Sequence, residues 1–280
     1  TDPRIIAVAG SLGAGKTVGA SGTVALNDLG VPTGNAVEAS IVNGSSVTST
    51  NAAAGGVELS ATVDQTIYAA GGEVALTTGS GSGLAFGVGI AMTISDLPVT
   101  ATVTDSHIDA PSLDIEASIG GTVNTISAGA GVSTNSVAIA GSAAVNDIDD
   151  TVNASIVGGS SPQVVETSGA ITVAAKNTTD YATGAGDVEI GKTGTGAAAI
   201  ALNDLATTTQ AVATYANLTV QAGGAVEVTA ETSGTVDSIA AGAQGAQQFA
   251  LGGSIAMTFT GTTTQAIVAT NIVTPGSIKI

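Results

Sequence analysis

The chain has 280 residues, and its acidic residues outnumber its basic ones 22 to 5, which gives a formal charge of −17. A negative field of this size repels nucleic acid and anionic membranes, so we expect no nucleic-acid partner and no membrane insertion. Cysteine is absent, which excludes disulfides and thiolate metal sites. Hydrophobic residues make up 44% but aromatic residues only 2%. The core is therefore expected to be thin and built from Ala and Val.

The first segment with a known pattern, residues 10–17, satisfies the phosphate-loop motif. Its defining positions are Gly10, Gly15, Lys16 and Thr17. A phosphate loop needs a helix whose N-terminus faces the anion, but residues 18–24 are rich in glycine and β-branched side chains. Residues 186–193 satisfy the same motif. We interpret both segments as lookalikes produced by an internal repeat, and we expect no cofactor.

One short apolar phrase recurs five times along the chain and defines this repeat. Its aligned alanines are Ala25, Ala91, Ala144, Ala201 and Ala256. The spacing is about 55 residues, which is typical of stacked repeats rather than of an enzyme domain. Residues 1–280 are accordingly predicted to form a single continuous repeat array.

Each repeat contains three kinds of segment, and all three favour strands. The recurring phrase, as in residues 137–145, is apolar or tiny on both faces and predicts a strand buried on both sides. A threonine-rich segment follows, as in residues 207–213. A third segment, as in residues 226–231, alternates apolar residues with acids, which predicts a strand with one solvent-exposed (wet) face. The fold class is therefore all-β.

The lag at which segments resemble one another indicates how the chain coils. Likeness appears at about 55 residues and not at about 18, so one whole repeat is expected to form one wide coil of a parallel β-solenoid, similar to a β-helix. In that arrangement the doubly apolar segment would form a buried middle sheet without spare room, and Gly89, Gly141 and Ala199 should resist enlargement. Three turns of about 18 residues per repeat remain the alternative.

Several polar residues stand in a fixed phase of the repeat. Asn27, Asn146 and Asn203 share one phase, and we interpret them as a polar ladder between stacked coils rather than as a ligand row. The densest acidic cluster is Asp147, Asp149 and Asp150. It is a candidate calcium site, with a solvated turn as the favoured alternative. No other metal site is expected. His107 is the single histidine and is expected to be a surface residue.

These observations favour a structural protein over an enzyme, but two other classes stay open. A polysaccharide-acting β-helix enzyme would need clustered acids together with basic or aromatic residues, and only five basic residues are scattered along the chain. An ice- or crystal-binding module is suggested by the threonine runs at 207–209 and 262–264. Residues 98–100 interrupt that series with Pro-Val-Thr.

The phrases at 201–204, 223–233 and 252–257 resemble the repeat regions of large bacterial surface adhesins of the filamentous-haemagglutinin-like and leukotoxin-type filamentous kinds. The resemblance covers nearly the whole chain and lies in its repeats rich in Ala, Gly, Thr and Val. It implies a secreted, extracellular β-solenoid stalk on the bacterial cell surface, with roles in cell adhesion and biofilm formation and an unknown host or cell-surface receptor. The family's secretion module is not seen in these residues, and no site residues are carried over.

The two ends of the sequence fall inside repeats. The acidic-type strand is still running at residues 276–280, and neither end shows a cap. The expected partners are therefore further repeats of a longer protein, or identical subunits stacked head to tail in an extracellular filament.

Overall fold

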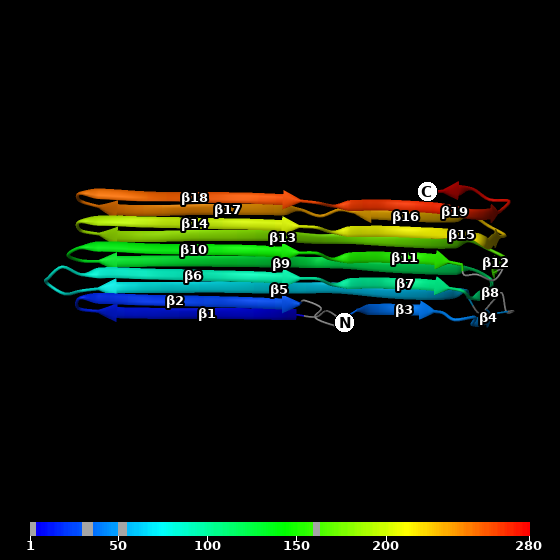
Figure 1. Cartoon of the computed structure of the whole chain (residues 1–280), viewed down its shortest axis with the longest axis horizontal. Helices are drawn as coiled ribbons and strands as arrows, with labels where there is room; N and C mark the ends of the chain where they lie inside the picture. The colour runs from blue at the N-terminus through cyan, green and yellow to red at the C-terminus, as the bar shows by residue number, and fades with distance from the viewer. Residues whose placement is uncertain (1–3, 30–35, 50–54, 159–162) are drawn as a thin grey trace.

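The computed structural model describes residues 4–29, 36–49, 55–158 and 163–280. Within these residues all regular structure is β, and the strands pair in parallel throughout three sheets. Figure 1 shows the chain winding into flat coils that stack on one another from β1 and β2 at one edge to β18 and β19 at the other. The predicted all-β parallel solenoid is confirmed.

Sheet A runs the full width of the coil and contains the long strands. Its members are β1 (Arg4–Gly15), β5 (Val57–Thr77), β9 (Leu113–Ser133), β13 (Ile171–Gly191), β16 (Val226–Thr232), β17 (Val236–Ala246) and β20 (Ile278–Lys279). Three of these strands, β5, β9 and β13, have 21 residues each. At about 3.3 Å per residue, such a strand spans about 70 Å.

Sheets B and C share the return path of each coil. Sheet B contains β2 (Val18–Leu29), β6 (Leu84–Ser95), β10 (Val137–Ile148), β14 (Gly194–Leu205) and β18 (Phe249–Thr260). Sheet C contains β3 (Val37–Ile41), β4 (Ser46–Thr48), β7 (Pro98–Thr104), β8 (His107–Ala110), β11 (Thr151–Val157), β12 (Gln163–Thr167), β15 (Thr208–Ala222) and β19 (Thr263–Val273). Sheet B faces one half of sheet A, and sheet C faces the other half.

The register confirms that one repeat is one wide coil. Ala144 pairs with Ala91 on one side and with Ala201 on the other, and the same alignment continues to Ala25 and Ala256. Strands that neighbour each other in a sheet are thus separated by a whole repeat in sequence, because every coil adds one strand to each sheet. Three short turns per repeat would pair residues about 18 apart, so that alternative is wrong.

The expectation of a buried middle sheet is also wrong, because the coil has two layers and not three. The 12-residue strand β10 and the seven-residue strand β11 are separated by only two residues and continue in the same direction. Together with the two residues between them, they match the length of the 21-residue strand β9 that they face. The segment that carries the recurring apolar phrase, which we call the anchor segment or anchor phrase, therefore lies beside the threonine segment and not between two other sheets. Only one of its faces is covered.

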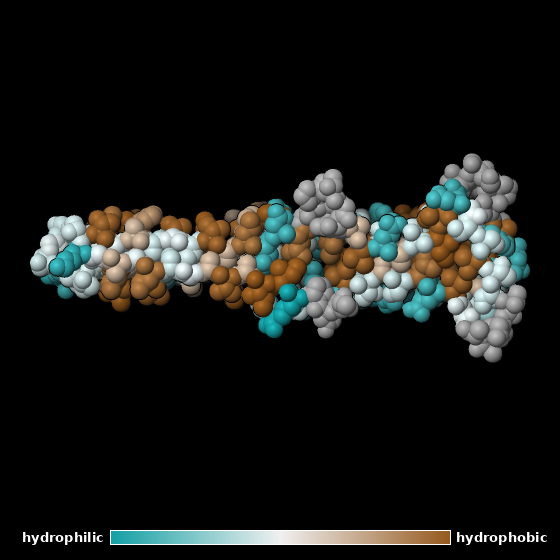
Figure 2. All heavy atoms as spheres, turned by 90° about the horizontal axis from the view of Figure 1, so that it is seen from below, coloured by the Kyte–Doolittle hydropathy of each residue, from teal (hydrophilic) through white to brown (hydrophobic). Residues whose placement is uncertain are grey.

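The two halves of the coil have different cores. Between sheets A and C, branched aliphatic side chains such as Ile115, Val152 and Val173 are fully buried. Between sheets A and B the buried side chains are mostly alanines, including Ala144 and Ala201. Because small side chains let the two backbones approach closely, the A–B half is the thinner one, as Figure 2 shows at its left.

The outer surfaces of the two halves differ as well. Acids alternate with buried residues on the A–C half, as with Asp114 and Glu116 in β9, which confirms the predicted wet face. On the A–B half, large apolar side chains of inner coils point outward from both sheets, at 37–57% exposure (Figure 2). They include Val74, Ile126, Val188 and Ile190 on sheet A, and Phe86, Ile139 and Ile200 on sheet B. The second apolar face predicted to be buried is therefore exposed.

Glycines mark the places where the two layers touch. A Cβ on the inward-facing Gly89 would lie 2.9 Å from the carbonyl oxygen of Ala128, whereas one on Gly141 would meet nothing closer than 3.6 Å. Gly141 points outward, so the expectation that it resists enlargement is wrong, while Gly89 and the buried Ala199 do face the interior. Gly121 in β9 has φ +112°, where L side chains are strained.

Candidate functional site

The phosphate-loop lookalike is part of an extended strand. Gly10 and Gly15 belong to β1, and Lys16 and Thr17 form the tight connection to β2. The second copy of the motif lies in β13 and in the equivalent connection at Lys192. A Cβ on Gly15 would lie 1.8 Å from the carbonyl oxygen of Val18, so this glycine is needed where the chain reverses. Neither copy forms a loop followed by a helix.

The candidate calcium residues do not converge. Asp147 points outward from β10 and Asp149 is exposed, while Asp150 is completely buried. One Asp150 oxygen accepts hydrogen bonds from the Ser95 hydroxyl at 2.7 Å and from the Leu97 backbone N–H at 3.0 Å. Burial raises the pKa of Asp150 to about 6, although these bonds oppose the rise. In the described residues, no three His, Cys, Asp or Glu side chains are grouped so that they could hold a metal ion.

The predicted polar ladder is present between Asn146 and Asn203 and crosses both sheets of the A–B half, whereas Asn27 donates to the backbone carbonyl oxygen of Tyr68 at 2.8 Å. The Asn146 amide donates to Asn203 Oδ1 at 2.9 Å, and the Thr125 hydroxyl donates to Asn146 Oδ1 at 2.5 Å. Asn203 donates in turn to the hydroxyl of Ser238 at 2.9 Å. Because these side chains are nearly all buried, the ladder satisfies polar groups inside the coil stack and leaves no row of free ligands.

The remaining sequence candidates lie on the surface or vary from coil to coil. His107 is partly exposed, and its Nδ1 lies 2.9 Å from the carbonyl oxygen of Val164. The threonine runs align, with Thr208 opposite Thr263 in the register of β15 and β19. The outward row through Thr100 nevertheless continues as Asn153 and Gln210, so the surface is not a uniform threonine array.

Three carboxylates that sequence reasoning missed lie between sheets A and B. Glu73 and Asp187 are each 3% exposed, and Glu189 is fully buried. Both oxygens of Asp187, both of Glu189 and one of Glu73 have no hydrogen-bond partner. The only sequence signal was an acid at an inward phase of a small-residue strand, as in Gly71-Gly72-Glu73-Val74. In the other coils, the phase of Glu73 and Asp187 is filled by Ser11, Gly129 and Gly242.

Burial raises the pKa of all three carboxyls. For Glu73 the Ser21 hydroxyl and the Ala130 backbone N–H oppose the effect, and for Asp187 the Ser142 hydroxyl opposes it without completing a hydrogen bond. Burial, with added repulsion from Asp187 and Glu73, raises the pKa of Glu189 to about 8, so this carboxyl is mostly protonated at neutral pH.

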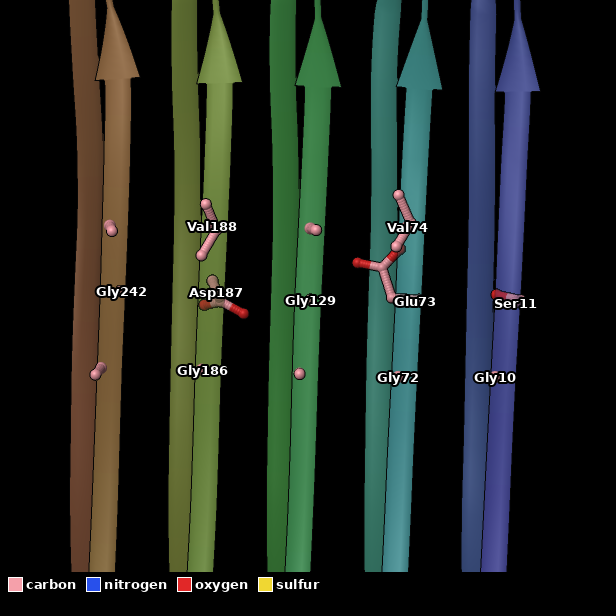
Figure 3. A pocket seen from close by; sticks show the side chains of 14 residues that line it. Gly10, Ser11, Gly72, Glu73, Val74, Gly129, Gly186, Asp187, Val188 and Gly242 are labelled. Atoms are coloured by element: carbon pink, nitrogen blue, oxygen red, sulfur yellow. The ribbon is translucent and has the colours of Figure 1, made fainter.

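A shallow apolar groove of about 810 Å³ crosses the outer face of sheet A over the same residues. It follows a row of outward positions without large side chains, at Gly10, Gly72, Ala128, Gly186 and Ala241. In Figure 3, Gly10, Gly72 and Gly186 of this row lie at one level on separate strands, with Val74 and Val188 along one side. The groove runs along the stacking direction.

No helix in the described part of the chain has the length and apolar character needed to cross a membrane. Comparison with protein-family models, with curated proteins and with solved structures gave no match to this chain.

Proposed function

We propose that the chain is a structural element, a segment of a rigid, acidic solenoid that belongs to a bacterial cell-surface adhesin or an extracellular filament. One observation carries the proposal: coils of about 55 residues stack in one unbroken register through all five copies of the anchor phrase. A stack of this kind is extended simply by adding coils.

The two open edges of the stack are complementary. At one edge, β1 occupies the phase of the second half of a long strand, because Arg4 pairs with Thr66. At the other edge, β17 has that same phase and β20 occupies the first part of the next long strand. A further coil placed on β17 would therefore continue sheet A in the register already used, through ordinary parallel pairing.

The shape of the stack favours resistance to bending over length along the stacking direction. Each coil adds one strand spacing, about 4.8 Å, to the length of the stack but spans about 70 Å across it. Five coils thus form a slab wider than it is tall, as Figure 1 shows. A polymer of such coils would be a wide ribbon that resists bending in the plane of its sheets.

The surface chemistry suits an extracellular role in adhesion. Acids outside the A–C half keep neighbouring ribbons apart by repulsion, whereas the exposed apolar faces of the A–B half are surfaces that can associate. The partners we propose are further repeats of the same polypeptide or identical subunits head to tail, together with a cell-surface receptor that remains to be identified.

The experiment is negative-stain imaging with light scattering of the purified chain, from about 0.01 to 1 M NaCl. Screening shortens from about 30 Å to about 3 Å over this range, so repulsion between acidic subunits falls. We expect ribbons that lengthen with salt at constant width. Single particles at every salt concentration would contradict the stacking of subunits.

A pair of variants identifies the edge that is used. Neighbouring residues of a strand direct their backbone N–H groups to opposite sides, so one of Ala7→Pro and Val8→Pro removes a donor on the open side of β1. That variant should fold like the parent chain and fail to elongate. Unchanged elongation of both folded variants would contradict pairing through β1.

A further inference from the structure

The outer face of sheet A over the A–B half is a continuous apolar surface. The register of β1, β5, β9, β13 and β17 aligns the outward residues of these strands in rows along the stacking direction. In the four rows nearest the turns that lead into sheet B, with five positions in each row, every outward residue of these described strands is Val, Ile, Leu, Ala or Gly. Large exposed apolar surfaces of this kind mark interaction sites.

This face is also flat. In Figures 1 and 3 the strands of sheet A run straight and side by side over the A–B half. Flat sheets of many strands are unusual and are typically stabilised by stacking on another sheet, because strands otherwise twist. Sheet B covers the inner face of this half. The outer face is therefore shaped for a second flat surface.

Large and small residues alternate across the face. The row at Gly72 and Gly186 is the row of small residues that forms the groove described above. On β5, β9, β13 and β17, one of the two outward residues beside this row is large and the other is Ala or Gly. The large residues change sides from each strand to the next and are 41–67% exposed, in the order Val74, Ile126, Val188 and Ile239. Only β1, at the open edge, has a large residue on both sides, Val8 and Leu12.

The pattern is complementary to itself. If a second copy is turned by 180° about the line of the small row, each strand faces the same strand of the other copy in the opposite direction. Val74 then lies over Ala70 of the second copy, and Val188 lies over Gly184. The strands β9 and β17 place a large residue over an alanine in the same way. A two-fold contact needs this match of one surface with itself.

The same operation does not fit the outer face of sheet B. Its row of smallest residues contains Gly141 and Gly253. On β6, however, the two outward residues beside this row are Phe86 and Ile90. A two-fold rotation would therefore press two large side chains against each other on that strand. The arrangement of residue sizes favours sheet A as the contact surface.

Area and charge both suit a pair of chains. The A–B half is 12 residues long and five strands high, about 40 Å by 24 Å, so a pair would bury about 960 Å² per chain and about 1,900 Å² in total. Stable interfaces bury about 1,200–2,000 Å². Because the rotation reverses the strand direction, the acidic A–C halves project from opposite ends of the pair. They are separated by about 40 Å, which exceeds the screening length of about 30 Å even at 0.01 M salt.

We propose that two copies of the chain pair face to face through the outer surface of sheet A in the A–B half, with the row of small residues on the two-fold axis. This contact goes beyond the edge-to-edge stacking proposed above and does not depend on it, because the two contacts use different surfaces. Where both operate, the pairing joins two ribbons into one ribbon of double thickness.

The absence of cysteine allows the contact to be tested at one residue. Gly72 lies on the axis, and a Cβ there would meet nothing within 4 Å, so Gly72→Cys brings two thiols opposite each other in a folded pair. A thiol-specific cross-linker of about 10 Å, the usual distance between packed sheets, should join them. Copies stacked edge to edge repeat every five strands, about 24 Å, and lie beyond its reach. Gly253→Cys, at an equally open glycine on sheet B, is the matched control and should cross-link at least tenfold more slowly.

A second pair of variants tests whether the apolar face drives the pairing. Val188→Glu places a charge in the contact, whereas Ile200→Glu places one on the outer face of sheet B. Circular dichroism should show both to be folded, since both residues are exposed. Sedimentation equilibrium in 0.01 M NaCl should give the mass of one chain for Val188→Glu and of two chains for the parent and Ile200→Glu.

The outcomes separate the two contacts. The pairing is overturned if Gly253→Cys cross-links as fast as Gly72→Cys, if Val188→Glu pairs like the parent, or if the parent stays single at every concentration, which would assign the face to another kind of partner. Ribbons that elongate without any cross-link at residue 72 would overturn the pairing and leave edge stacking intact. Cross-linked pairs that never elongate would support the pairing and contradict edge stacking.

Discussion

The close contact of sheets A and B predicts opposite effects of one methyl group at two adjacent residues. Gly71 and Gly72 both lie in β5, but Gly71 faces sheet B and Gly72 faces outward. A Cβ on Gly71 would lie 2.5 Å from the carbonyl oxygen of Ile90, whereas a Cβ on Gly72 would have nothing within 4 Å. Gly71→Ala should therefore force the two layers apart, and Gly72→Ala should not.

The expected magnitude follows from this contact. Restoring an ordinary contact of 3.4 Å at Gly71 requires the backbones to separate by about 0.9 Å, and each is hydrogen-bonded to strands on both sides. Overpacking of this kind costs about 1–3 kcal/mol. Replacing glycine also restricts the unfolded chain, which stabilises both variants by about 0.4–1 kcal/mol. That term is common to the pair, so the difference between the variants isolates the overpacking.

Urea unfolding followed by far-ultraviolet circular dichroism measures the difference, because the chain lacks tryptophan. We expect Gly72→Ala to equal or exceed the parent chain and Gly71→Ala to fall below Gly72→Ala by about 1–3 kcal/mol. A second pair, Gly89→Leu and Gly141→Leu, should show the same order, with the inward variant less stable. Equal stability within either pair would refute the two-layer geometry.

Three further outcomes are expected. Since burial raises the Asp150 pKa from 3.8 to about 6, the folded chain holds this proton more tightly, so the contribution of this group to stability is fully present below pH 4 and is lost, by about 3 kcal/mol, as the pH rises through 6. Asp150→Asn should remove that part of the slope in urea unfolding at several pH values, and an unchanged slope would contradict it. Asn146→Ala leaves the buried Asn203 Oδ1 without its donor and should lower the free energy of unfolding by about 1–3 kcal/mol, whereas no loss would mean that the ladder is not a stabilising network. Glu227→Gln removes an exposed ion pair with Lys279 and should change stability by less than about 0.5 kcal/mol in the same assay, with a larger loss showing that the pair is not solvent-screened.

The sequence was informative wherever the repeat imposed a pattern. The aligned alanines predicted the register of sheet B residue by residue, because identical neighbours stack when every coil has the same path. The alternation of Asp114 and Glu116 with Leu113 and Ile115 predicted the wet face of sheet A. Asn146 and Asn203 predicted a hydrogen-bonded ladder, which the structure contains.

The layer order could not be obtained from apolar content alone. Residues such as Phe86 and Ile139 made the anchor strand look buried on both faces, yet they are exposed. Segment length carried the missing information, because the anchor and threonine strands together match one long strand of sheet A. The inward positions of Glu73 and Asp187 were equally hidden. They lie 114 residues apart in sequence and stand on either side of Gly129 only through the register of three coils.

The most direct test of a stack that grows by adding coils is a tandem fusion of two copies of the chain. Ile278 has the phase of Val57, and Arg4 has the phase of Thr66. Joining the copies through the three residues Ser-Ala-Thr, as found at positions 60–62, therefore keeps the repeat in step across the junction.

Electron microscopy of this fusion should show a single ribbon. Its extent along the stacking direction should double from about 24 to about 48 Å, while its width stays near 70 Å. It should also unfold at a higher temperature than one copy, because a former open edge is paired. Two separate slabs joined by a flexible connection would contradict the account.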